Sequence, residues 1–516
     1  MSIVKALAVF SSFTLISRIL GFVRDILSAS VLGAGLVADC FFVALKLPNF
    51  FRRLFAEGAF SASFIPVFSA TLSQGGKEEA LSFAETAFSS LIMVLLVVVA
   101  LMEIFAPGVI YILAGGFSSD QAKFQLAVLL TRITFPFLLF ISLVSLLGGI
   151  LNALGKFSET AATPIILNLS MISALIFFSG QFSTPAHALA LAVSIAGFIQ
   201  LLWLYLACRR SGYRIRIVKP RMTPKVKEML IIMMPAALGA GVIQINLMID
   251  MIIASHLPDG SISYLFYADR LNQLPIGVIG VALGTVLLPL LARNIAEGDA
   301  SEVSINQNKA IELGLFLTIP AAAAFMIMPF QLIHVLFERN AFTTEDSWQT
   351  AWALMAYAAG LPAYVLAKIF SPGYFARKDT RTPVKYALVA LVVNMTLNLI
   401  LMQYFAHVGL AMATAISAWL NVIMLAGGLI RRGHFSLESR VIARVFKYLL
   451  ASMVMAAVVW SLSGQIGDMF AGHMGTRIAG LLILIGAGVV SYLVMIFLTG
   501  ATSLQELKSL TGRKVK

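Results

Sequence analysis

The sequence predicts an all-α membrane protein, and three observations support this prediction. The chain has 516 residues, of which 59% are hydrophobic and 12% are charged, whereas roughly a quarter of the residues in a soluble domain are charged. Many segments, such as residues 89–114, exceed the roughly 20 apolar residues that a helix needs to cross the hydrocarbon core. The short alternating segments of a transmembrane β-barrel are absent from the sequence.

Breaks at glycine, proline and charge clusters divide the chain into about fourteen expected spans. Most of the 37 Lys and Arg residues fall in loops on the side of the N-terminus, whereas Lys123, Arg339 and Arg477 fall on the other side. By the positive-inside rule, both termini are expected in the cytoplasm. The same asymmetry explains most of the net charge of +13 without a nucleic-acid partner. The spans are centred near residues 17, 50, 98, 138, 168, 195, 242, 278, 320, 358, 393, 418, 453 and 487.

Weak internal repeats predict two halves of similar design. Residues 29–49 resemble 254–275, and residues 151–164 resemble 374–383, at a similar offset that covers six spans. An even number of spans gives both halves the same orientation, and transporters built from repeats commonly bind substrate between them near mid-membrane. We therefore expect two pseudo-symmetric lobes around a central cavity. The expected domains are a six-helix lobe (1–208), a basic cytoplasmic linker (209–227), a second six-helix lobe (228–433), and two additional transmembrane helices with a tail (434–516).

Arginine predominates among the cations that fall inside the expected spans. Arg18 and Arg24 lie in the first span, Arg52 and Arg53 in the second, and Arg270 in the second half. An intramembrane charge costs at least about 2.5–3.5 kcal/mol, so each needs a partner or a wet cavity. Since the planar guanidinium binds phosphate oxygens two at a time and stays charged, this choice of residue predicts an anionic, phosphorylated ligand.

Helical spacing groups further polar residues with the arginines of the first span. Ser17 and Arg24 share one stripe, with the small Gly21 between them, while Arg18 and Asp25 share another stripe about 100° away. Both stripes can face a broad cavity. The structural alternative is that Arg18 with Asp25, or Arg270 with Asp269, form neutral pairs and bind no ligand.

The second span carries its own polar stripe. Asn49, Arg53 and Glu57 follow one another at intervals of four residues. Pro48 is expected to kink the helix and free a backbone carbonyl. The alternative is that Arg52 and Arg53 anchor the helix end at the headgroups by snorkelling.

Motifs of enzyme chemistry are missing from the sequence, which favours a transporter. No phosphate-binding loop, HExxH, GxSxG or Cys–His cluster occurs. An inside-negative potential favours outward movement of a doubly charged anion by about 2 × 2.3 kcal/mol per 100 mV. We expect no cofactor, and Na⁺ or H⁺ coupling stays open. Asp250 is the best candidate ligand for a coupling cation, with Asp379 and Thr396 as further candidates, although a structural role for Asp250 is equally open.

Four stretches of the chain resemble the MurJ (MviN) family of bacterial lipid II flippases, in the multidrug/oligosaccharidyl-lipid/polysaccharide exporter superfamily. The resemblance implies fourteen helices, two lobes around a central cavity, and a groove for the prenyl tail between the last two helices. It also implies alternating access that delivers the peptidoglycan precursor to the outer face of the inner membrane. The stretches are SRILGFVRD (17–25), KLPNFFRRLFAEGAFS (46–61), YADRLNQLPIGVIGVALGTVLLP (267–289) and KDTRTPVK (378–385).

The resemblance also implies the partners and the site residues. The expected partners are lipid II and the bilayer, and the resemblance allows other membrane proteins of cell-wall synthesis. For the sodium site of some relatives, Asp250 matches, but Phe375 stands where an asparagine is expected. The implied substrate-binding residues are Arg18, Arg24, Arg52, Arg53, Arg270, Ser17, Asp25, Ala29, Asp39, Asn49, Glu57 and Ser263.

Three other functions stay open at this point. A flippase for another polyprenyl-linked oligosaccharide would use the same cations, because its diphosphate is the same. A non-transporting scaffold for cell-wall enzymes would have no use for the charges, so charge-swapping substitutions should then be harmless. An exporter of cationic drugs is disfavoured, since its cavity should present acidic residues.

Overall fold

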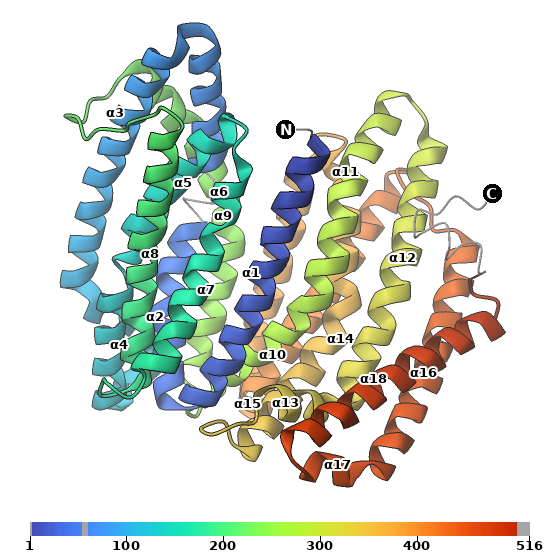
Figure 1. Cartoon of the computed structure of the whole chain (residues 1–516). Helices are drawn as coiled ribbons and strands as arrows, with labels where there is room; N and C mark the ends of the chain where they lie inside the picture. Colours follow the sequence, from blue (N-terminus) through green and yellow to red (C-terminus); the bar gives the residue numbers. More distant parts are fainter. Residues whose placement is uncertain (1–2, 54–59, 503–516) are drawn as a thin grey trace. The chain divides into compact units, whose positions relative to one another are not determined.

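The computed structural model describes residues 3–53 and 60–502, and no strand occurs among them (Figure 1). The predicted all-α class is therefore confirmed. The chain forms two compact units. Unit 1 contains the described residues up to Ser263 together with Arg339–Phe342, and unit 2 contains Tyr264–Glu338 and the described residues from Thr343 onward. Along the chain, the boundary between the units falls within a helix, α10 (Ser261–Pro275), and not in the basic segment 209–227. The division into pseudo-symmetric lobes stays a prediction.

Unit 1 is a bundle in which helices distant in sequence pack side by side. α1 packs on α7, α2 on α4, α5 on both α3 and α8, and α9 on α3. Its elements are α1 (Ile3–Leu32), α2 (Leu36–Phe51), α3 (Phe60–Leu113), η2 (Gly115–Ser119), α4 (Gln121–Thr134), α5 (Phe137–Ala153), α6 (Phe157–Ala161), α7 (Thr163–Ser173), η3 (Ala174–Phe178), α8 (Pro185–Arg210) and α9 (Pro224–Ala254).

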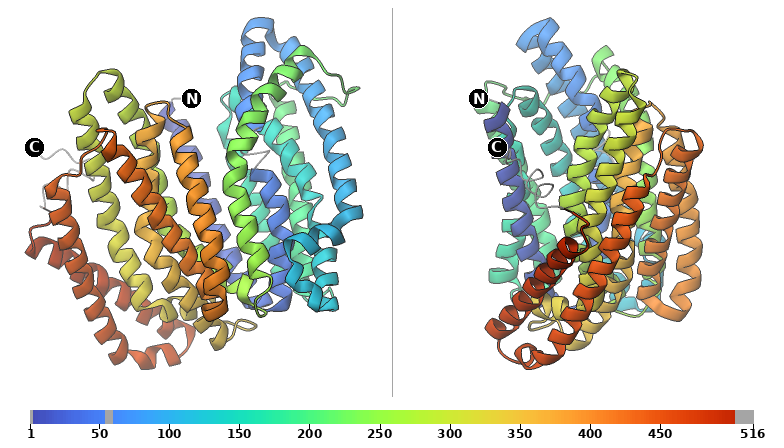
Figure 2. Two further views of the ribbon diagram at one scale, coloured as in Figure 1. Left: turned by 180° about the vertical axis from the view of Figure 1, so that it is seen from behind. Right: turned by 90° about the vertical axis from the view of Figure 1, so that its right-hand side faces the viewer.

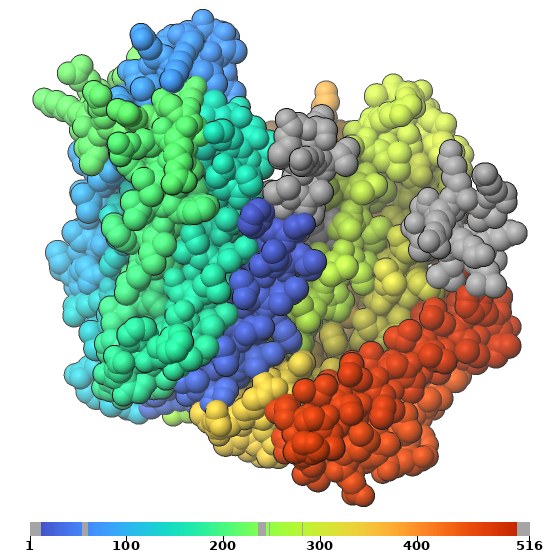
Figure 3. Space-filling view, viewed as in Figure 1, coloured from blue at the N-terminus to red at the C-terminus, as the bar shows by residue number. Residues whose placement is uncertain are grey.

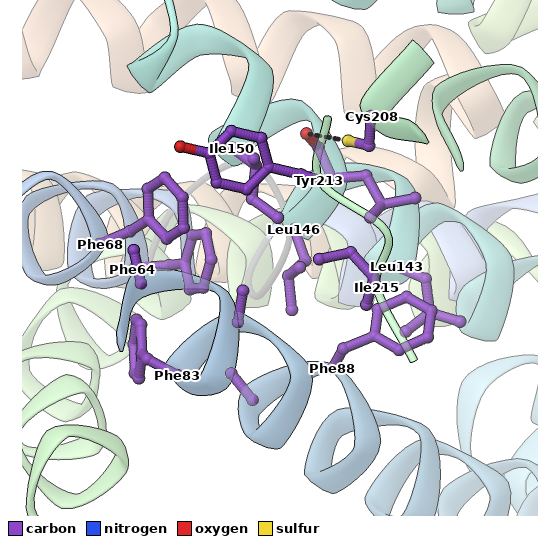
Figure 4. Packing of buried hydrophobic residues seen from close by; sticks show 14 of the residues in the cluster. Phe64, Phe68, Phe83, Phe88, Leu143, Leu146, Ile150, Cys208, Tyr213 and Ile215 are labelled. Carbon is purple, nitrogen blue, oxygen red and sulfur yellow. Dashed lines mark hydrogen bonds between the residues drawn. The ribbon is translucent and has the colours of Figure 1, made fainter. Parts of the chain in front are cut away.

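The core of unit 1 depends on a sharp turn inside α3. Gly76 has φ of 75°, a left-handed conformation that favours glycine, and it divides α3 into two arms. The arms pack face to face, and the rings of Phe64 and Phe83, one from each arm, stack with their centroids 5.5 Å apart. Figure 4 shows this aromatic cluster against Leu146 and Ile150 of α5. Burial of these large side chains holds α3 and α5 together.

The basic segment that follows α8 is attached to unit 1. Tyr213 and Ile215 are buried in the core. The backbone N–H of Arg216 donates to Glu85 Oε1 (3.1 Å), and that of Val218 donates to Ser89 Oγ (2.8 Å). Figure 3 shows the segment, in green, beside the part of α3 around its internal turn, in blue. The charged side chains of this predicted linker therefore extend from a backbone that is fixed on α3.

Unit 2 continues from α10 and ends in an antiparallel pair of helices. α14 packs on α12 and α15, and α16 packs on α12 and α18, as the red helices of Figure 2 illustrate. A capping box of Thr343 and Asp346 begins α14. The further elements are η4 (Ile276–Gly280), α11 (Val281–Ala296), α12 (Ala300–Ile327), α13 (Pro329–Phe337), α14 (Thr344–Phe375), α15 (Arg381–Arg431), α16 (Ser439–Gln465), α17 (Gly467–Ala471) and α18 (Met474–Leu498).

The helices lie where the spans were predicted. Not every predicted span corresponds to a helix that is long and apolar enough to cross a membrane. Every predicted centre lies in a helical segment. Within the described residues, ten helices are long and apolar enough to cross a membrane. One of them, α15, has 51 residues and turns at Ala406 (φ 46°), so it contains two predicted spans. The chain is thus a multi-pass membrane protein, and the count of about fourteen stays a prediction.

Candidate functional site

The most complete polar arrangement among the predicted site residues surrounds Arg24 in unit 1. Its Nε and Nη2 donate to Asp25 Oδ1 at 3.1 and 2.7 Å, and its Nη1 donates to Asn168 Oδ1 at 3.0 Å. The Arg24 side chain is 14% exposed and that of Asp25 is 6% exposed. A charge this far from water requires such partners. The guanidinium is therefore neutralised and held in one orientation.

Asn168, on α7, joins the two ends of the predicted stripe on α1. Its Nδ2 donates to the carbonyl oxygen of Ser17 at 2.9 Å, while its Oδ1 receives the bond from Arg24. A Cβ added at Gly21 would be in ordinary van der Waals contact with the same amide. The prediction that Ser17 and Arg24 share one face is confirmed. Sequence reasoning did not select Asn168, although a lone amide in the apolar segment TPIILNLSMI was a usable signal.

Arg18 lies on a different face of α1 from Arg24. It is exposed in unit 1, beside the exposed apolar residues Leu15 and Ile19. The two arginines thus lie on separate faces, as expected, but Asp25, which was expected on the stripe of Arg18, is bonded to Arg24. A role for Arg18 in binding a ligand stays a prediction.

The polar stripe predicted for α2 is described only in part. Asn49 accepts a bond from Arg52 Nε (3.2 Å), three residues on, and Arg53 is exposed. The Nδ2 of Asn49 donates to the carbonyl oxygen of Leu45 (3.0 Å). The helix loosens into a π turn at Arg52 and Arg53, after Pro48, so regular helical spacing no longer sets the side-chain directions. Glu57 lies outside the described residues.

Asp39 and Ser263, which are 224 residues apart, are bonded to each other within unit 1. Asp39 Oδ1 accepts from the backbone N–H of Ser263 (2.9 Å) and from its Oγ (2.6 Å), while Oδ2 accepts from the N–H of Gly260 (2.8 Å). The carboxylate therefore caps the beginning of α10 from another helix. Lys123 Nζ lies 3.8 Å from Asp39 and also pairs with Asp259. We call Asp39, Gly260, Ser263 and Lys123 the α10 latch.

Two predicted residues remain to be placed. Ala29 is fully buried in unit 1, where it contributes to the packing of α1. Arg270 belongs to unit 2, where its guanidinium lies 4.6 Å from the centroid of the Phe266 ring, a cation–π contact. Its neighbour Asp269 accepts a hydrogen bond from Gln273.

Two of the three residues proposed for a sodium site cannot bind the same ion, and a role for Asp250 stays a prediction. Asp379 accepts from Thr382 Oγ1 (2.6 Å) and N–H (3.0 Å) and from Arg432 Nη1 (2.7 Å), and these bonds hold the pKa of its carboxyl well below the ordinary range. Thr396 is exposed and lies in α15, roughly 22 Å along the helix from its beginning next to Asp379. One ion cannot touch both. Among the described residues, no group of three or more His, Cys, Asp or Glu residues could hold a metal ion, and Asp250 lies in unit 1.

Two cavities accompany these residues in unit 1. The larger, of about 530 Å³, is almost entirely apolar and lies between α3, α9 and the segment around Arg221. The smaller, of about 210 Å³, has a polar wall that includes Arg52, and we call it the Arg52 cavity. Sequence reasoning anticipated neither, because both are enclosed by helices that are distant in sequence.

Comparisons with known proteins agree on one family. A family model described as "Lipid II flippase MurJ" matches residues 28–478. The chain is 41% identical to a probable lipid II flippase MurJ of Rhizobium tropici, with 100% of this chain and 97% of the relative covered. It is 38% identical to the corresponding protein of Vibrio cholerae, with 99% and 98% covered. It is also 36% identical to the lipid II flippase MurJ of Burkholderia cenocepacia, with 84% and 85% covered.

Solved structures show the same relationship. A structure described as lipid II flippase MurJ in an inward closed conformation matches with a TM-score of 0.78 at 28% identity, covering 98% of this chain and 99% of that chain. An inward-facing multidrug transporter of the MATE family matches with a TM-score of 0.65 at 14% identity, covering 83% and 98%. The second match shows that the chain shares its fold with this MATE transporter, which its description places in the MOP superfamily.

Proposed function

We propose that this chain, which belongs to the MurJ family of lipid II flippases, moves lipid II from the cytoplasmic to the periplasmic leaflet of the bacterial inner membrane by alternating access. The surplus of Lys and Arg on one side of the expected spans supports a cytoplasmic position for both termini. The chain acts as a transporter, and no covalent step is needed from its residues.

The partly buried, oriented guanidinium of Arg24 is the observation on which this proposal rests. Asp25 and Asn168 occupy three of its five N–H groups, and Nη1 also faces the weak acceptor Sδ of Met171 at 3.9 Å. Donors therefore remain for a stronger acceptor. A diphosphate offers charged oxygens that an oriented guanidinium binds well. Asp25 offsets the charge while no substrate is bound, which lowers the cost of keeping Arg24 away from water.

The membrane potential is the proposed driving force. A headgroup with two negative charges gains about 4.6 kcal/mol per 100 mV when it moves outward through an inside-negative membrane. Dissipating the potential with an ionophore should therefore stop the appearance of labelled precursor outside the cell. Unchanged labelling would refute this energy source without affecting the assignment of Arg24.

Complementation in a conditional depletion strain tests the role of Arg24. We expect Arg24→Ala to be produced and inserted but unable to support wall synthesis. Arg24→Lys should also be impaired, because a lysine keeps the charge but loses the planar fork. The matched control is Arg293→Ala, since Arg293 is 76% exposed and pairs with Glu297 one helical turn away. Normal growth with Arg24→Ala would overturn the proposal.

The same test distinguishes a lipid II flippase from a flippase for a different polyprenyl-linked oligosaccharide. In that case, depletion of the parent chain would leave wall synthesis intact. Arg24→Ala would then show no wall defect, while the surface display of another lipid-linked sugar would fall. A scaffold without transport would tolerate Arg24→Ala, Arg18→Ala and Arg270→Ala alike.

A further inference from the structure

The larger cavity of unit 1 is open towards the membrane. It has a volume of about 530 Å³ and lies between α3, α9 and the segment around Arg221, and we call it the α3–α9 cavity. Met93 and Val94 line it and are 52% and 53% exposed, so the cavity is open where these side chains lie. Both belong to the apolar segment 89–114, which faces hydrocarbon in a spanning helix. A ligand can therefore enter this cavity from the bilayer.

The wall of the α3–α9 cavity suits an alkyl chain better than it suits water. Leu91, Met229 and Met233 are typical of its side chains. A buried water needs about two to four polar partners, and this wall is almost entirely apolar. An empty cavity would leave the lining atoms without dispersion contacts on one side. Because lipid tails are as apolar as these side chains, a tail can enter without a change in its solvation and restore the contacts.

The lining of the α3–α9 cavity is as long as one leaflet is deep. On α3 it extends from Ala87 to Val98, which is roughly 16 Å at the rise of an α-helix. On α9 it extends from Val226 to Met233, roughly 10 Å. The hydrocarbon core of a bilayer is about 30 Å thick, so one leaflet contributes about half of that. An acyl chain that lies along α3 therefore matches the length of the cavity.

A positive charge lies at the end of the cavity that meets the basic segment. Arg221 is exposed, and among the described residues it is the one charged side chain of the lining. The segment is fixed at this end, because the N–H of Val218 donates to Oγ of Ser89, which precedes Ser90 of the lining. Seven other Lys and Arg residues belong to the segment 209–227. The headgroup of a lipid in the cavity would thus meet a strongly basic surface.

We propose that the α3–α9 cavity binds one acyl chain of an anionic phospholipid, whose phosphate is held by Arg221. A guanidinium binds phosphate oxygens well, and the cations of the segment favour a lipid with a net negative charge over a zwitterionic one. A cationic amphiphile would be repelled. The bound lipid fills the space between α3 and α9 and stabilises their packing. This inference does not depend on which substrate the chain transports.

Photocrosslinking of a phospholipid to the full-length chain tests this proposal. The probe is phosphatidylglycerol with a diazirine on one acyl chain, added as a minor component to phosphatidylcholine nanodiscs that contain the chain. Phosphatidylcholine with the same photoreactive acyl chain is the neutral comparison. Mass spectrometry should find the anionic probe on the cavity wall, at Leu91 or Met233, more often than the neutral probe. Arg221→Ala should reduce this labelling about fivefold, the effect of removing one cation near a membrane surface.

Two further variants separate the cavity from its charged surroundings. Arg214→Ala is the matched control, because Arg214 is an exposed arginine of the same segment that does not line the cavity. It should leave the labelling of the wall unchanged. Val94→Trp keeps every charge but adds bulk at the opening, so it should reduce the labelling by the anionic probe.

Several results would contradict the proposal. Equal labelling of the wall by the anionic and the neutral probe would show that the headgroup is not recognised. An equal loss in Arg214→Ala and Arg221→Ala would show a general attraction of the basic surface and no defined site. Absence of label from the wall would show that no acyl chain enters. Displacement of the probe by undecaprenyl diphosphate would assign the cavity to the tail of the substrate and overturn the choice of a phospholipid.

Discussion

Replacing Asp39 by alanine should destabilise the chain strongly, because the carboxylate is the centre of the α10 latch. Asp39 is 1% exposed and accepts three hydrogen bonds from Gly260 and Ser263. Bonds to a charged group contribute about 1.5–3 kcal/mol each, so three could reach about 4.5–9 kcal/mol. Desolvation of the carboxylate offsets part of this, and removal of one member of a buried charged pair typically costs 3–5 kcal/mol. We expect the free energy of unfolding to fall by about 3–5 kcal/mol.

Thermal unfolding of the purified chain in detergent provides the assay, and Asp259→Ala is the control. Asp259 pairs with the same Lys123 but is 56% exposed, so its loss should lower the free energy of unfolding by less than about 1 kcal/mol. Asp39→Asn should lie between the two, because it keeps one acceptor oxygen for Ser263. Equal losses of stability in Asp39→Ala and Asp259→Ala would refute the reasoning, since burial would then make no difference.

Three further predictions concern positions outside the predicted site. Ala406→Gly should raise the unfolding midpoint by the equivalent of about 1 kcal/mol, because Ala406 adopts φ 46° and glycine has no steric penalty there. Gly116→Ala should lower it, since a Cβ at Gly116 would overlap the carbonyl oxygen of Ser255. Burial alone would raise the pKa of Glu338, but hydrogen bonds, foremost from His334, hold this pKa below its ordinary value. The resulting stability is therefore present above about pH 4.3 and is lost as pH falls through the folded pKa. Glu338→Gln should flatten that acid limb in unfolding scans at graded pH.

Local periodicity predicted the parts of the site that lie on one regular helix. Ser17 and Arg24 share a face of α1 because the helix repeats every 3.6 residues, and the structure places both against Asn168. On α2 the corresponding stripe stays a prediction, because Asn49 accepts a bond from Arg52 and Glu57 lies outside the described residues. Pro48 and the π turn that follows it break the repeat on which the prediction depended.

Contacts between distant segments could not be read from the sequence. The bond between Asp39 and Ser263 joins residues 224 positions apart, and no spacing rule connects them. The proposal that Asp379 and Thr396 share one ion failed for a local reason, since Asp379 caps α15 while Thr396 lies roughly 22 Å along that helix. Composition shows that polar groups are buried in a membrane protein, but only the packing shows which of them meet.

In unit 1, the number of hydrogen bonds that a polar group already makes distinguishes residues that stabilise the fold from residues that can bind a ligand. The carboxylate of Asp39 receives three hydrogen bonds and lies near Lys123, so it has no capacity left for a ligand and acts by holding α10. Among the described residues, Arg24 keeps donors beyond those bonded to Asp25 and Asn168. Since this guanidinium is oriented but only partly satisfied, a substrate diphosphate should bind it and stabilise the chain against thermal unfolding. Arg24→Ala should reduce that stabilisation more than it lowers the stability of the free chain.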